Sequence, residues 1–82
     1  MRVIKTGHLH TVLLSFTLNG HEATLLKQHT PNGEFNGFYE VRCKHPEQGP
    51  YTAGLYPLYA TASNCYTNAV DNIQRIILES VG

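Results

Sequence analysis

Charged residues and tryptophan are scarce in this chain. It has 82 residues, no tryptophan, and only 15% charged residues. Soluble domains typically carry about 25% charged residues, so neutral polar side chains must cover much of the surface. Six basic and six acidic residues give a formal net charge of zero. A general nucleic-acid binder would carry a basic excess and an acidic mimic of DNA the reverse, so composition argues against both classes of protein.

Cysteine is also scarce, with Cys43 and Cys65 alone and no CxxC pair. Two cysteines are too few for a disulfide scaffold, so we expect reduced core thiols in a cytoplasmic protein. The stretch after Met1–Thr6 lacks the apolar segment of a signal peptide. No run approaches the roughly 18 apolar residues of a membrane helix. We therefore expect one small domain spanning residues 1–82, with neither a membrane nor nucleic acid as a partner.

Motifs for catalysis and for cofactor binding are missing as well. The chain has no P-loop, no G-x-G-x-x-G and no G-x-S-x-G. Asp71 is the only aspartate, and no pair of carboxylates has a spacing suited to acid–base work. Both cysteines lie on faces that we expect to be apolar, where a thiol is unreactive. The sequence therefore predicts a protein that is not an enzyme and binds no cofactor.

What is present is a clear hairpin signal. Asn19-Gly20 separates two alternating runs, Thr11–Leu18 and His21–Gln28. Both central residues of a type I′ turn need positive φ, which Asn and Gly tolerate best, so a two-residue turn is expected here. Such a turn fixes which residues face one another across the two strands.

The expected register divides the hairpin into two faces. The apolar face pairs Leu18 with His21, Phe16 with Ala23, Leu14 with Leu25, Val12 with Lys27, and His10 with His29. The polar face pairs Thr17 with Glu22, Ser15 with Thr24, Leu13 with Leu26, and Thr11 with Gln28. One face of an antiparallel sheet is commonly buried and the other solvated. The Leu13–Leu26 pair is then an apolar spot on the outer face.

Two further segments complete the predicted sheet. Phe38–Lys44 alternates apolar residues with Glu40, Arg42 and Lys44, which indicates a third strand with one charged face. Tyr51–Ala60 is rich in strand-forming residues but contains Gly54 and Pro57, so we expect an edge strand or an ordered loop there.

The last segment predicts a helix. Apolar residues from Tyr66 to Ile77 recur at helical spacing, so we expect a helix from about Ala62 or Asn64 to about Ser80. Thr61 or Ser63 is the expected N-terminal cap. The helix must bury its apolar side on the apolar sheet face. The predicted fold is α+β, an antiparallel three- to four-stranded sheet backed by one C-terminal helix.

Three histidines form a candidate metal site. His8 and His10 are alternate residues of one predicted strand, and the expected register places His29 opposite His10. Three converging imidazoles suit zinc or nickel. No HExxH motif or carboxylate partner accompanies them, so strand-end histidines in contact with solvent are the alternative interpretation.

Several features favour recognition of a protein partner. Tyrosine combines a large contact area with a polar tip and is common at protein interfaces. The Leu13–Leu26 spot and the neutral outer face of the helix are further candidate contact surfaces. They could dock a partner or a second copy of the chain, and the tyrosines could instead wall the core. The candidate partner-binding residues are Tyr51, Tyr56, Tyr59, Leu13, Leu26, Asn68 and Arg75.

In size and architecture, a compact antiparallel sheet backed by one helix, the chain resembles the small phage-encoded anti-CRISPR inhibitors. That resemblance implies a protein that docks on a CRISPR effector complex in the host cytoplasm and blocks DNA binding or cleavage. The chain also resembles HicB-type antitoxins, in a strand beginning at Phe38-Tyr39-Glu40-Val41 that leads through a Gly/Pro loop to a helix over Thr61–Leu78. That alternative implies an antitoxin or a small dimeric regulatory module.

Overall fold

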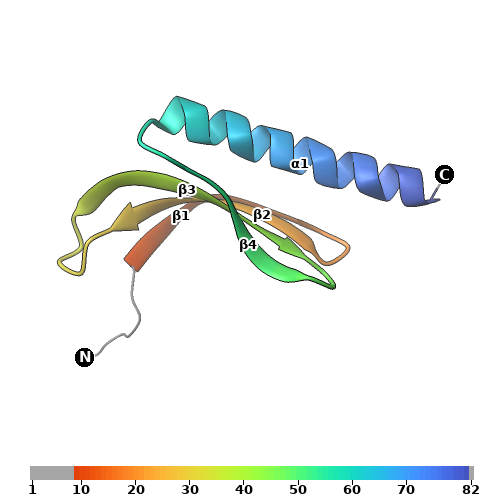
Figure 1. Ribbon diagram of the computed structural model, residues 1–82, viewed down its shortest axis with the longest axis horizontal. Helices are drawn as coiled ribbons and strands as arrows, with labels where there is room; N and C mark the ends of the chain where they lie inside the picture. Colours follow the sequence, from red (N-terminus) through yellow and green to blue (C-terminus); the bar gives the residue numbers. More distant parts are fainter. Residues whose placement is uncertain (1–8, 82) are drawn as a thin grey trace.

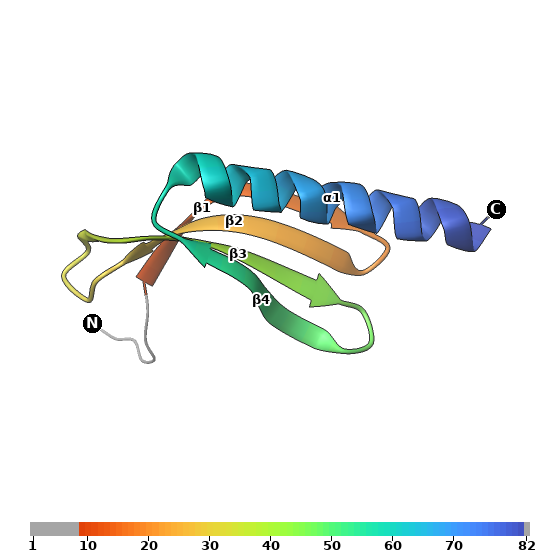
Figure 2. The same cartoon turned by 45° about the horizontal axis from the view of Figure 1, so that its top comes forward.

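The structure, a computed structural model, describes residues 9–81 and confirms the predicted α+β fold (Figure 1). Four antiparallel strands lie in the order β1-β2-β3-β4, and one helix packs across one face of the sheet (Figure 2). The elements are β1 (Leu9–Leu18), β2 (His21–His29), β3 (Phe35–His45), β4 (Gly49–Tyr56) and α1 (Tyr59–Val81). No helix in this part of the chain is long and apolar enough to cross a membrane.

The β1–β2 turn is the predicted two-residue turn. Asn19 has a φ of 51° and Gly20 a φ of 84°, as a type I′ turn requires. The expected pairs from Leu18–His21 to Leu14–Leu25 are all present. The local turn signal therefore fixed the register correctly over the half of the hairpin nearest to it.

Beyond Leu14, the predicted register is wrong by one residue. Leu13 is an extra residue in β1, a β-bulge, so Val12 rather than Leu13 lies opposite Leu26. The same shift places His10 opposite Gln28 and Thr11 opposite Lys27. A bulge moves every following pair by one position. Because Val12 and Leu13 are both apolar, the burial pattern did not distinguish the two registers.

The other two strands are longer or better defined than predicted. β3 begins at Phe35 rather than Phe38, so Asn36-Gly37, which precedes the predicted strand, lies within it at a register irregularity. Gly37 has a φ of 97°, which a glycine adopts without steric cost. Residues 49–56 form an edge strand, one of the two structures expected there, with a second bulge at Ala53.

The helix begins earlier than predicted, at Tyr59. Its first backbone hydrogen bond runs from the Ala62 amide to the Leu58 carbonyl, at 3.1 Å. Thr61 and Ser63 therefore lie inside the first turns and do not cap the helix. Pro57 fixes the backbone immediately before this start.

The core lies between the helix and the inner face of the sheet. Its buried residues are Ala23, Leu25, Val41, Cys43, Ala62 and Ile73. The helix packs mainly over β2, β3 and β4 and contacts β1 least. The opposite, outer face of the sheet is covered by no helix of residues 9–81 (Figure 2).

Candidate protein-binding surfaces

The predicted pairing of His10 with His29, on which the histidine cluster depends, does not form. His10 lies opposite Gln28, whereas His29 lies opposite Leu9, so alternation places the two imidazoles on opposite faces of the sheet. The Nε2 atom of His29 lies 2.9 Å from the Thr11 hydroxyl. His8 lies outside the described residues. Within residues 9–81, no group of three or more His, Cys, Asp or Glu side chains is arranged to hold a metal ion.

The three candidate tyrosines are divided between two places. Tyr51 is opposite Cys43, near one end of β4, whereas Tyr56 is opposite Tyr39, at the other end. The Tyr59 ring meets the Tyr39 ring edge-on, with centroids 5.6 Å apart. Tyr51 and Tyr59 keep about half of their surface exposed, at 56% and 46%. The tyrosines therefore offer two separate exposed rings rather than one continuous patch.

Tyr56 is bound into the fold more tightly than the other two. Its ring packs against the core and lies over Gly54, where a Cβ atom would overlap it. A hydrogen bond between the Tyr56 hydroxyl and Cys65 raises the pKa of Tyr56. The absence of a side chain at Gly54 is thus what allows the ring to lie down along β4.

Substitution of Tyr56 is expected to reduce stability. Tyr56→Ala should lower the free energy of unfolding by about 2 kcal/mol, because it removes a partly buried ring and leaves a gap beside the core. Tyr56→Phe, which retains the ring, should lose less than about half of that. Urea denaturation of the two variants measures the difference. Equal stability of Tyr56→Ala and the wild type would show that the packing of this ring does not contribute to the free energy of unfolding.

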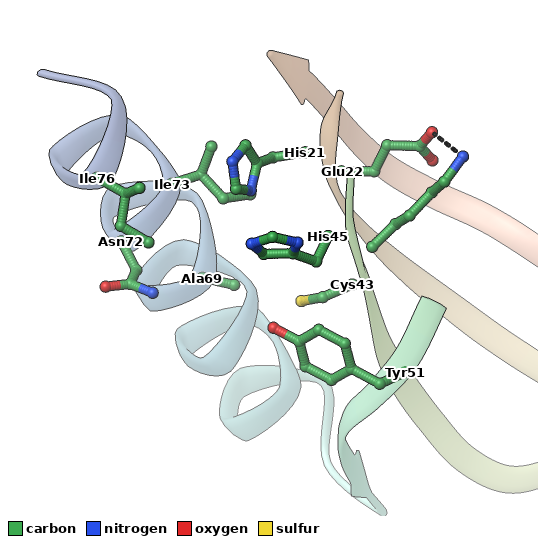
Figure 3. Close-up of a pocket in the computed structure, with 10 residues that line it drawn as sticks. His21, Glu22, Cys43, His45, Tyr51, Ala69, Asn72, Ile73 and Ile76 are labelled. Carbon is green, nitrogen blue, oxygen red and sulfur yellow. Dashed lines mark ion pairs between the residues drawn. The ribbon is translucent and has the colours of Figure 1, made fainter. Parts of the chain in front are cut away.

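A small cavity lies between the helix and the ends of β2, β3 and β4 (Figure 3). Its volume is about 70 Å³, enough for a few water molecules. The His21 and His45 rings stand edge to face at 5.1 Å between centroids, beside Cys43 and Tyr51. The helix contributes the side chains of Ala69, Asn72, Ile73 and Ile76.

The chemistry of this cavity favours a structural role. Burial raises the pKa of the Cys43 thiol, and the opposing hydrogen bond with Tyr51 does not cancel that effect. A protonated thiol is a poor nucleophile and a poor metal ligand. The Nδ1 atom of His45 accepts the backbone N–H groups of Glu47 and Gln48, at 3.1 and 3.3 Å. That nitrogen therefore holds the β3–β4 turn rather than facing a reactant.

The outer sheet face carries a hydrogen-bonded network centred on Glu40. This residue is only 4% exposed although it lies on the face without a helix. Its carboxylate accepts hydrogen bonds from Thr52 Oγ1 at 2.6 Å and from Gln28 Nε2 at 2.9 Å. Arg42 donates to both carboxylate oxygens, at 3.1 and 3.3 Å. Asn36 extends the network by donating to Gln28 Oε1 at 2.9 Å. Three strands are thus tied together across this face.

The network keeps Glu40 ionised. Burial by itself raises the pKa of Glu40, but the hydrogen bonds from Thr52, Arg42 and Gln28 outweigh it, together with the charge of Arg42. The pKa of Glu40 therefore lies below its ordinary value. The carboxylate in turn holds the Arg42 guanidinium, whose side chain remains 43% exposed.

Exposed apolar side chains surround this network. Val12, Leu26, Glu40 and Leu55 are successive neighbours across the four strands. Leu26 is 2% exposed, whereas Val12 is 52% and Leu55 is 49% exposed. Phe38, on the same face two residues before Glu40, is 41% exposed. We call Val12, Phe38, Leu55 and Arg42 the outer-face patch.

The outer-face patch differs from the apolar spot predicted from the sequence. Leu26 lies beside Val12 of this patch but is buried, so it offers little contact area of its own. Leu13 belongs to the bulge and does not face Leu26. The sequence pattern does not predict Val12, Phe38 and Leu55 as contact residues, because the expected register places Val12 on the inner face and gives no pairing for Leu55.

The two helix residues expected at a partner surface are accessible. Asn68 and Arg75 are both exposed. Arg75 donates a hydrogen bond to Asn72 Oδ1 at 2.9 Å, one turn earlier on the same helix. Leu78, near the C-terminal end of α1, is the most exposed of the large apolar side chains, at 68%. These residues lie on a different layer from the outer-face patch.

No protein-family model matches the chain, and neither a curated protein nor a solved structure matches it. Its function must therefore be inferred from the residues and surfaces described above.

Proposed function

We propose that this chain is a non-enzymatic protein-binding module that docks through the outer-face patch. The observation that carries the proposal is the position of three large apolar side chains, 41–52% exposed, around the network that holds Arg42, on a sheet face that no helix of the described residues covers. Aromatic residues and arginine are enriched in protein interfaces and supply much of their binding energy. The patch combines an aromatic ring and an arginine with two aliphatic side chains.

The rigidity of the patch supports this function. Arg42 is held by two hydrogen bonds to a buried carboxylate, so little side-chain entropy remains to be lost when a partner binds. The patch also rests on the paired strands of the sheet rather than on a loop. A preorganised surface of this kind favours docking without rearrangement of the backbone.

Charge on this face favours a protein partner over nucleic acid. Arg42 is paired with Glu40, and Lys44 Nζ lies 3.8 Å from Glu22 Oε2. Both of these cations on the outer face therefore have an anion beside them. Phosphate binding requires several cations free to displace counterions, which this balanced arrangement does not supply.

We further propose that the partner is a CRISPR effector complex in the cytoplasm, which the chain prevents from binding or cleaving DNA. Support for this narrower proposal is the resemblance in size and architecture to anti-CRISPR inhibitors. The test is direct. Purified effector complexes of different types are incubated with the chain, and both association and DNA cleavage are measured.

Leu55→Glu should strongly weaken this association. A carboxylate in the middle of an apolar contact loses its hydration when the partner covers it. We therefore expect binding to weaken at least about tenfold. Leu78→Glu introduces the same charge at an exposed site outside the patch and should bind as the wild type does. If Leu55→Glu binds with unchanged affinity, the patch is not the docking surface.

A dimeric regulatory module is the second candidate function. The position of β1 at the edge of the sheet, where a second chain could pair with it, is the observation that favours it. A dimeric regulatory module would be a dimer at the protein concentration at which it functions. It would not inhibit any CRISPR effector in the assay above.

A further inference from the structure

The strand β1 is an open edge of the sheet. Within residues 9–81 it pairs with β2 alone, and none of its ten residues is Asp, Glu, Lys or Arg. Proteins commonly protect such edges with charged residues, prolines or bulges. The other edge, β4, has Pro50, Gly54 and a bulge at Ala53. In β1 the bulge at Leu13 protects only one end, and Leu14–Leu18 remains a regular, uncharged strand.

Apolar surface is exposed along this edge. Leu9, Val12, Leu13 and Leu14 of β1 are between 37% and 52% exposed. Leu14 is on the inner face, opposite the fully buried Leu25. It is exposed because α1 packs mainly over the other three strands. The inner apolar layer thus continues past the helix to the edge without being covered.

The free backbone groups of the edge can be assigned from the register. In a two-residue hairpin, the residues flanking the turn, Leu18 and His21, are a hydrogen-bonded pair. Hydrogen-bonded and non-bonded pairs alternate along the ladder, so Leu18, Phe16 and Leu14 direct their backbone groups toward β2. The N–H and C=O groups of Ser15 and Thr17 then point away from the sheet.

We propose that two copies of this chain associate by antiparallel pairing of β1, centred on Phe16. Ser15 of one copy then lies opposite Thr17 of the other, and the outward backbone groups of the two residues form the intermolecular hydrogen bonds. Leu14 lies opposite Leu18 of the other copy. This register uses the whole regular segment and leaves the bulge outside.

A second copy suits this edge for chemical reasons. An uncharged strand paired with itself brings no like charges together. The register also places apolar residues against apolar residues on the inner face and hydroxyls against hydroxyls on the outer face. The two-fold axis of an antiparallel pair is perpendicular to the sheet, so both helices lie on one side. The two outer-face patches then share one continuous eight-stranded surface.

Wild-type protein tests the register directly. A mixture of isotope-labelled and unlabelled chain should give an intermolecular NOE between the Hα atoms of Leu14 and Leu18, because these residues form a close, non-hydrogen-bonded pair across the interface. Within one chain they are four residues apart on the same strand, too far for such a signal. Sedimentation from about 1 µM to about 1 mM should show a monomer–dimer equilibrium.

Two matched variants separate this interface from any other. Ser15→Lys/Thr17→Lys places lysine opposite lysine twice across the interface, and the dimer should weaken about tenfold. Ser15→Glu/Thr17→Lys places glutamate opposite lysine in the same two pairs and should restore the dimer. Both variants carry Lys opposite Glu22 within the chain, so their folds should be alike by circular dichroism.

Three results would overturn the proposal. They are a monomer throughout the concentration range, absence of the Leu14–Leu18 signal in a dimer, and equal dimerisation of the two variants. None of these bears on docking through the outer-face patch, since Leu55 lies on the opposite edge strand. A dimer lost in Leu55→Glu but kept in Ser15→Lys/Thr17→Lys would place the self-association on the outer face instead.

Discussion

Glu40→Ala is expected to lower the free energy of unfolding by about 3 kcal/mol at neutral pH. The substitution removes the acceptor for Thr52, Gln28 and Arg42 at once. Donors left without a partner in a part-buried site each cost free energy. Arg42 adds little to this loss of stability, because its exposed guanidinium can form hydrogen bonds with water instead. Urea denaturation at pH 7 measures the loss.

The cost of Glu40→Ala should depend on pH. The pKa of Glu40 is lowered in the folded state, so its contribution to stability is fully present above the ordinary value of 4.5. That contribution is lost as the pH falls through the lower pKa of the native state. The stability gap between the wild type and the variant should therefore narrow below about pH 4.5.

The matched control is Glu34→Ala, which removes a carboxylate from an exposed site. It should change stability by less than about 0.5 kcal/mol at any pH. A gap between wild type and Glu40→Ala that stays constant from neutral to acid pH would contradict the role assigned to the ionised carboxylate. Glu40→Gln, which retains one acceptor oxygen but no charge, should fall between the wild type and Glu40→Ala.

Leu25→Ala is the second substitution with a large expected effect, also about 3 kcal/mol. Leu25 is 0% exposed and lies between Leu14 and Val41 on the inner face. Truncation removes buried apolar surface and leaves a cavity that the paired strands cannot close. In a domain whose total stability is about 5–15 kcal/mol, this is a substantial fraction.

Hydrogen exchange locates the effect of Leu25→Ala. Amides of α1 should lose protection more than those of the β1–β2 turn, because the helix depends on the inner face for its packing. Leu78→Ala, at a site that is 68% exposed, is the control and should be nearly neutral. Uniform loss of protection throughout the chain would instead indicate that the domain opens only as a whole.

Local signals explain why much of the fold could be predicted from the sequence. Asn19-Gly20 specifies a turn through the positive φ values of two adjacent residues. Alternation in β1–β3 and helical spacing in α1 depend on neighbours a few positions away. The inner face and its helix follow from these patterns, as do the five pairs nearest the turn. No partner far along the chain is needed for any of them.

The candidate site was only partly predictable. Glu40 and Arg42 were correctly placed on one charged face, but the burial of Glu40 was not foreseen. It depends on Gln28 and Thr52, which lie on two other strands, each twelve residues away. Alternation within one strand says which face a residue occupies and nothing about which side chains meet there.

The sequence by itself determined the element types, their order and the register next to the turn, since these depend on backbone preferences and short-range periodicity. Only the tertiary structure decided the bulge at Leu13, and with it which residue faces Leu26 and where the histidines lie. A bulge is placed by the pairing of whole strands and their twist, not by the residue that forms it. For the same reason the outer-face patch and the open edge of β1 emerge only when all four strands are in place.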